Sequence, residues 1–83
     1  MYKILVDVYV PSLLQNFEFF IPLKSRVDEV TALIRKAIEE MTDGMFFPDS
    51  GVMLCDRESG EIFNINLTVE QIGLKEGSRL MLM

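Results

Sequence analysis

Residues 25–44 read SRVDEVTALIRKAIEEMTDG, and this stretch decides the fold. Its apolar residues recur at every third or fourth position, the spacing of one face of an α-helix; they are Val27, Val30, Ile34, Ala37, Ile38 and Met41. Ser25 followed by Asp28 is typical of a helix N-terminal cap, and Gly44 is suited to end the helix in a left-handed conformation. We therefore predict one amphipathic helix, which must bury its apolar stripe against a second layer.

Segments in which apolar residues occur at every second position lie before and after this helix in the sequence. Residues 2–10 and 17–23 are apolar at every second position and are joined by a short polar turn, a pattern that predicts a β-hairpin. The same alternation predicts three strands after the helix, at residues 52–55, 61–65 and 78–83. The expected fold is α+β, with a mixed sheet of about five strands packed on one helix in a single domain over residues 1–83.

The composition excludes several classes of partner. Eight basic and thirteen acidic residues give a net charge of −5, whereas binding to nucleic acid or to anionic lipid depends on clustered Lys and Arg. No apolar run approaches the roughly 20 residues that span a bilayer, and the first residues lack the long apolar stretch of a signal peptide. We expect a cytoplasmic protein that neither binds nucleic acid nor inserts into a membrane.

The sequence offers little for catalysis. It contains no histidine and one cysteine, so a His base, a His metal ligand and a multi-cysteine metal site are all unavailable. The acidic residues Asp56, Glu58 and Glu61 do not have the ligand spacing of a calcium loop. We therefore predict a protein that is not an enzyme and has no catalytic, cofactor-binding or metal-binding residues.

The C-terminal part of the sequence resembles ubiquitin and its β-grasp relatives. The resemblance is carried by residues 67–80, LTVEQIGLKEGSRL, in which a turn capped by Thr68 and Gln71 leads through a polar bend into the last strand. Gly73 and Gly77 fall at bends where this fold needs positive φ, which glycine adopts without steric cost. The helix opening VDEV is also similar to that of the family. This resemblance implies a ubiquitin-like β-grasp fold.

Within this superfamily the sequence is most similar to the YukD-like proteins of bacteria, which are small and associated with type VII secretion. The shared features are the strand VMLCD with its polar turn and the ending GLKEGSRL. The resemblance implies an adaptor or accessory protein of a secretion apparatus, with other proteins, including secretion components, as partners. The sequence ends in Leu82 and Met83, without the Gly-Gly tail that conjugation and sulfur transfer require. The alternative is a tail-less relative of ubiquitin-like modifiers or sulfur carriers.

The face of the sheet that the helix does not cover is the candidate functional surface. If Leu80 and Leu82 face the helix, the residues between them point away, and several of these are methionines. Solvated sheet faces are mostly polar, whereas an exposed Met-rich patch adapts to varied protein partners. We predict a protein-interaction surface, with a Cys55 thiol accessible to reagents, formed by Leu5, Tyr9, Met53, Cys55, Met81 and Met83. Two alternatives stay open: the loop at residues 45–47 covers this face, or a second copy does so in a homo-oligomer.

Overall fold

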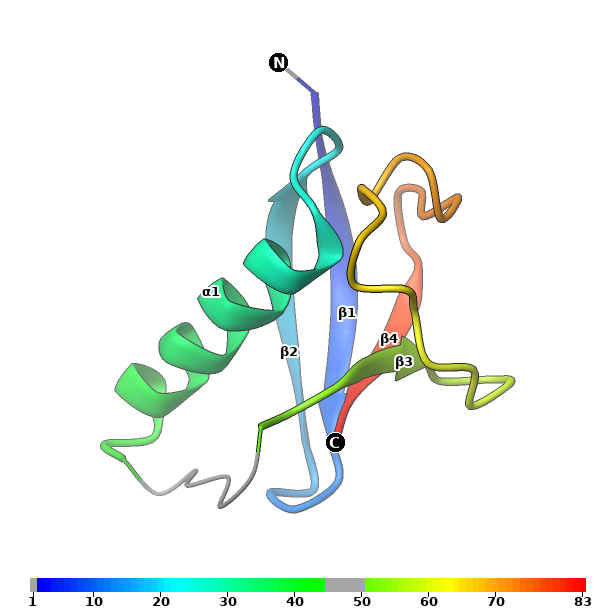
Figure 1. Cartoon of the computed structure of the whole chain (residues 1–83). Coiled ribbons are helices and arrows are strands. Elements are labelled where there is room, and N and C mark those ends of the chain that lie inside the picture. The colour runs from blue at the N-terminus through cyan, green and yellow to red at the C-terminus, as the bar shows by residue number, and fades with distance from the viewer. Residues whose placement is uncertain (1, 45–50) are drawn as a thin grey trace.

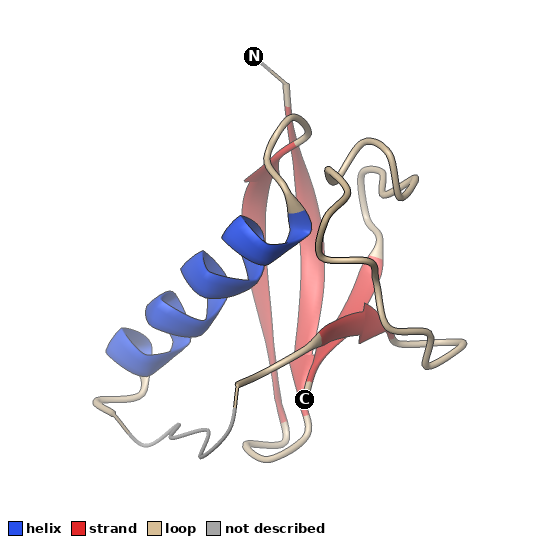
Figure 2. Cartoon of the chain, in the orientation of Figure 1, coloured by secondary structure: helices blue, strands red, loops and turns tan. Residues whose placement is uncertain are grey.

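The computed structural model describes residues 2–44 and 51–83. In chain order the elements are β1 (Lys3–Val10), β2 (Gln15–Pro22), α1 (Val27–Met41), β3 (Leu54–Asp56) and β4 (Arg79–Leu82). The helix lies across one face of the sheet (Figures 1 and 2). The strand order is β2-β1-β4-β3, with β1 parallel to β4 and the other neighbours antiparallel. The predicted α+β fold with a mixed sheet under one helix is confirmed.

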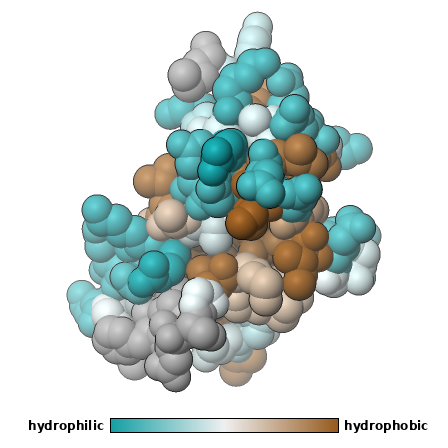
Figure 3. Space-filling view, viewed as in Figure 1, coloured by the Kyte–Doolittle hydropathy of each residue, from teal (hydrophilic) through white to brown (hydrophobic). Residues whose placement is uncertain are grey.

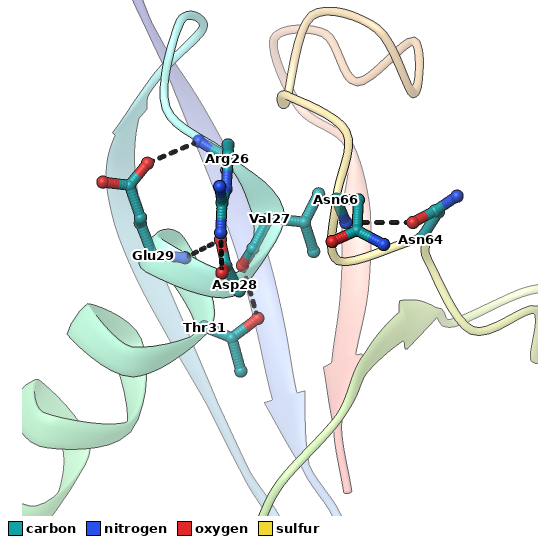
Figure 4. A network of polar contacts seen from close by, with 7 residues as sticks. All are labelled: Arg26, Val27, Asp28, Glu29, Thr31, Asn64 and Asn66. Atoms are coloured by element: carbon teal, nitrogen blue, oxygen red, sulfur yellow. Dashed lines mark hydrogen bonds and ion pairs between the residues drawn. The ribbon is translucent and has the colours of Figure 1, made fainter.

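Within the described residues the sheet has four strands, where about five were expected. Residues 61–65 contribute one isolated bridge, between Ile62 and Cys55. The extended run ends at Asn64, because its side-chain Oδ1 accepts the backbone N–H of Asn66 at 2.9 Å and closes a turn (Figure 4). This turn directs the chain toward the first turn of α1 instead of along β3.

The core lies between the sheet and α1. It is formed by every second residue of β1, with partners from each other element, and its members include Ile4, Val6, Val8, Val10, Ile21, Val30, Ile34, Ile38, Leu54, Leu80 and Leu82. Figure 3 shows the helix side of the molecule, where hydrophilic residues cover much of α1 and hydrophobic residues gather between α1 and the segment after β3. Four residues of the predicted helical stripe are buried, namely Val27, Val30, Ile34 and Ile38. Ala37 is half-buried, and Met41 is exposed because α1 extends past Ile38, its last core residue.

The helix begins one residue later than expected. The N-cap residue is Arg26 rather than Ser25, and the carboxylate of Glu29 closes the cap by accepting the Arg26 N–H at 3.0 Å (Figure 4). Asp28 instead pairs with the Arg26 guanidinium, and that hydrogen bond holds the pKa of the Asp28 carboxyl below its usual value. Both carboxylates lie at the positive end of the helix dipole, where they are stabilising.

The segment that resembles ubiquitin folds as predicted. The N–H of Thr68 donates to Gln71 Oε1 at 2.9 Å, and the N–H of Gln71 donates to Thr68 Oγ1 at 3.1 Å. Gly73 and Gly77 have φ values of +83° and +84°. A residue with a side chain would be strained in this conformation, whereas glycine is not. The capped turn places Val69 in the core, beside the start of α1.

Truncating the helical stripe should nearly unfold this protein. Ile34→Ala should lower the free energy of unfolding by about 2–5 kcal/mol, because it leaves a cavity in a packed core. The free energy of unfolding of a domain of this size is only about 5 kcal/mol. The exposed neighbour Lys36 provides the control, since Lys36→Ala should change stability by no more than about 0.5 kcal/mol. Urea denaturation followed by circular dichroism measures both, and equal midpoints would contradict the assignment of Ile34 to the core.

Candidate protein-interaction site

The face of the sheet opposite α1, which we call the outer face, follows from the alternation of the strands. Leu5, Asp7 and Tyr9 of β1 point away from the buried residues between them. Residues paired directly across a ladder share a face, so the register extends the outer face over the sheet. Tyr9 pairs with Met81 of β4, and Met81 pairs with Cys55 of β3. Three of the predicted residues therefore form one row across three strands.

Two more methionines continue the outer face beside this row. The N–H of Met53 donates to the carbonyl oxygen of Met83 at 2.7 Å, and the N–H of Met83 donates to the carbonyl oxygen of Met53 at 3.0 Å. Each lies two positions along the chain from Cys55 or Met81 and so shares their face. Their side chains are 47% and 50% exposed, and Ile62, bridged to Cys55, is exposed next to them. We call one set of residues the methionine patch: Tyr9, Met53, Ile62, Met81 and Met83.

Leu5 lies apart from the methionine patch. Its partner across the β1–β2 ladder is Phe20, an exposed aromatic residue. Asp7 lies between Leu5 and the patch, in a row with Glu18 on one side and Arg79 on the other. The six predicted residues thus share the outer face, but a charged row divides them into two apolar areas.

Arg57 extends over part of the outer face, a position that the sequence did not predict. Its guanidinium carbon lies 5.4 Å from the centre of the Tyr9 ring, within the range of a cation–π interaction. Its Nη2 lies 3.5 Å from Asp7 Oδ1 and 3.4 Å from Asn16 Oδ1. Arg57 lies one residue beyond β3, and its N–H donates to the Arg79 carbonyl oxygen, which continues the pairing with β4. The methionine patch therefore has a cation at its border.

Cys55 lies on the outer face but is not accessible. The predicted register is right, yet the residue is 0% exposed and its thiol donates to the Met81 carbonyl oxygen at 3.4 Å. The expectation of an accessible thiol is therefore wrong. The physical reason is side-chain length, because Cys55 sits between the longer Met81 and Ile62 at paired positions. Burial, with a smaller contribution from the charge of Asp56, raises the pKa of the Cys55 thiol.

Solved structures similar to this one supply the name of the fold. The ubiquitin-like domain of the Mycobacterium tuberculosis type VII secretion system protein EccD1 matches with a TM-score of 0.79 at 13% identity, over 100% of this chain and 99% of that chain. A chain of the MycP5-free ESX-5 inner membrane complex matches with a TM-score of 0.80 at 13% identity, over 98% of this chain and 20% of that chain. This protein has the ubiquitin-like β-grasp fold. No protein-family model and no curated protein sequence matches it.

The ubiquitin fold alone does not set the activity of this protein. A chain of the toluene 4-monooxygenase HD complex with the inhibitor 4-bromobenzoate matches with a TM-score of 0.78 at 16% identity, over 98% of this chain and 96% of that chain. One fold hosts many unrelated functions. The function of this ubiquitin-fold protein must therefore be argued from its own surface.

The acidic turn of this ubiquitin-fold protein is a structural feature. The carboxylate of Asp56 accepts the N–H of Glu58 at 3.2 Å and the hydroxyl of Ser59 at 3.0 Å, so its oxygens close the turn. Among residues 2–44 and 51–83, no group of three or more His, Cys, Asp or Glu side chains could hold a metal ion. No helix in that part of the chain is both long and apolar enough to cross a membrane. The loop at residues 45–47, one suggested cover of the outer face, lies outside the described residues.

Cys55 should resist thiol reagents in the folded protein. Burial removes access, and the raised pKa leaves less thiolate, the reactive form, at a given pH. Ellman's reagent at neutral pH should therefore label the native protein slowly and label one thiol at once in urea. Raising the pH should speed native labelling only above the range where a free cysteine reacts. Fast, complete labelling without urea would show that the thiol is exposed.

Proposed function

We propose that this protein is a non-catalytic ubiquitin-fold interaction module, acting in the cytoplasm as an adaptor or accessory component of a type VII-like secretion apparatus. Residues 1–83 would act as one domain, with the methionine patch as its binding surface. The observation that carries the proposal is the exposure of Met53 and Met83, each about half open to solvent on a sheet face away from the helix. Clustered apolar residues on the surface of a small protein usually mark a contact site.

The composition of the methionine patch supports a protein partner. Met, Tyr and Arg are all enriched in protein–protein interfaces, and Arg57 lies over Tyr9 at the border of the patch. Thioether side chains have three rotatable bonds and repack against differently shaped surfaces. Burial of Met53, Met81 and Met83 against a partner would supply the main driving force, because apolar burial contributes roughly 25 cal/mol per Å².

The proposed link to secretion rests on structural similarity. The similar domain of EccD1 belongs to a type VII secretion system protein, and the similar chain of the ESX-5 complex is part of a multi-chain assembly. This chain covers 20% of that ESX-5 chain, so there the fold is one part of a longer protein. An interaction module with this fold is suited to act beside such an assembly.

Charging the methionine patch should abolish partner binding without unfolding the protein. Met53→Lys combined with Met83→Lys alters two half-exposed side chains. The matched control, Met41→Lys combined with Leu14→Lys, adds the same charge at two exposed positions outside the patch. Tagged proteins would be used to capture partners from native lysate, with identification by mass spectrometry. Wild type and control should recover type VII secretion components, and recovery should survive raised salt, which screens charge but not apolar burial.

Three results would contradict the proposal. The patch variant could recover the same proteins as wild type, or the control could lose them too. The recovered protein could also be an activating enzyme, which would favour the alternative of a carrier or modifier. A self-associated species seen by light scattering, lost in the patch variant alone, would identify a second copy of the chain as the occupant.

A further inference from the structure

Two arginines occupy neighbouring positions on the outer face, next to the methionine patch. The Arg57 N–H donates to the Arg79 carbonyl oxygen at 3.2 Å, so the two residues pair where the β3–β4 ladder continues past β3. Residues paired across a ladder share a face, and Arg79 also pairs with Asp7 of β1. Each arginine is two residues along the chain from Cys55 or Met81. The arginine pair therefore borders the methionine patch directly.

The two guanidinium groups share a single carboxylate in ion-pair contact, that of Asp7 beside Arg57. Like charges at paired positions repel each other. The Arg79 side chain is exposed and forms no ion pair within residues 2–44 and 51–83. The carboxylate of Asp56, in the neighbouring acidic turn, accepts the hydrogen bonds that close that turn. One guanidinium of the pair is therefore open to a carboxylate from outside the chain.

The ion pair between Arg57 and Asp7 is itself loose. Its N···O distance of 3.5 Å exceeds the value of about 2.7–2.9 Å that is usual for a charge-assisted hydrogen bond. Arg57 Nε and Asp7 Oδ1 are both buried, and neither has a hydrogen-bond partner in the described part of the chain. Buried polar groups normally have a partner, and an unpaired one costs free energy. A second carboxylate thus competes with Asp7 for Arg57 more easily than it would with a tight bidentate pair.

The position of the arginine pair indicates what a partner must carry. Arg57 is held over Tyr9 of the methionine patch, and Arg79 lies two residues before Met81, roughly 6.7 Å along the strand. A partner segment that packs an apolar side chain on Met81 therefore brings a nearby side chain over the arginines. A carboxylate carries the single charge that matches one open guanidinium, whereas a phosphate carries about two and would lie beside Asp7.

We propose that the segment bound at the methionine patch carries an Asp or Glu beside its apolar residues, and that Arg57 and Arg79 bind its carboxylate. This inference rests on the proposed function, because burial at the patch supplies most of the binding free energy. Arg79 pairs with the carboxylate directly, and Arg57 divides its donors between that carboxylate and Asp7. Charge at such a border sets partner choice and orientation more than affinity.

The test uses three peptides with the purified protein. The first is Leu-Leu-Glu-Leu-Leu between Gly-Ser flanks, with both termini blocked so that Glu carries the only carboxylate; the others have Gln or Lys in place of Glu. In titrations followed by amide NMR shifts, all three should move the Met81 and Met83 amides. The Glu peptide should bind about two- to fivefold more tightly than the Gln peptide and also move the Arg79 signals. Raised salt should reduce this preference without abolishing binding.

Variants separate the arginine pair from general charge effects. Arg79→Gln removes an exposed guanidinium, so it should abolish the preference for Glu over Gln and leave the circular dichroism spectrum unchanged. The matched control, Arg35→Gln, removes the same charge at an exposed position on α1 and should keep the preference. Asp7→Asn removes the competing carboxylate and should raise the affinity for the Glu peptide about twofold.

The results that would overturn this inference differ from those that would overturn the proposed function. Equal binding of the Glu and Gln peptides at the patch would refute the carboxylate site and leave the patch as the binding surface. Weaker binding of the Glu peptide to Asp7→Asn would show that Asp7 positions the arginines and does not compete, which also refutes it. Shifts at Arg57 and Arg79 with the patch amides unmoved would show a carboxylate site independent of the patch. No shift at the patch with any peptide would overturn both proposals.

Discussion

The structure depends on β1, which is hydrogen-bonded on both sides while one of its faces is buried under α1. Its odd-numbered residues bond toward β4, as the N–H of Asp7 to the Ser78 carbonyl shows, and its even-numbered residues bond toward β2. The same alternation divides side chains between core and outer face. A slip of one residue would move Asp7 into the core and Val6 or Val8 into solvent. The register of this one strand therefore sets both the core and the outer-face row in which Tyr9 pairs with Met81.

The sequence predicted what periodicity controls. The range of α1, the burial of Leu80 and Leu82 and the shared face of Tyr9, Met81 and Cys55 all follow from regular spacing. Contacts between distant parts of the chain were not predictable. A local turn, not propensity, reduced residues 61–65 to a single bridge. Cys55 is buried because its paired neighbours on the outer face have longer side chains. Nothing in the sequence indicates that Arg57, in the turn after β3, lies over the ring of Tyr9 on β1.

The methionine patch and the β2 edge lie at different places on the sheet. The strand order puts β2 at one edge, while Met81 of β4 and the residues next to the ends of β3 and β4 carry most of the methionine patch toward the other. β1 separates them, and the charged row through Asp7 crosses the outer face between its apolar areas. A partner bound at the methionine patch therefore leaves the β2 edge of the sheet uncovered.

The parallel pairing of β1 with β4 has a consequence for how the chain is made. It joins Asp7 to Arg79, 72 residues apart in sequence. A ribosome adds about 5–20 residues per second, so the first strand waits roughly 4 to 14 s before its central partner has been synthesised. During that interval the nascent hairpin has one open side and an apolar stripe without its full cover. Translation speed through the middle of the message thus sets how long this strand side and apolar stripe stay exposed before the sheet can close.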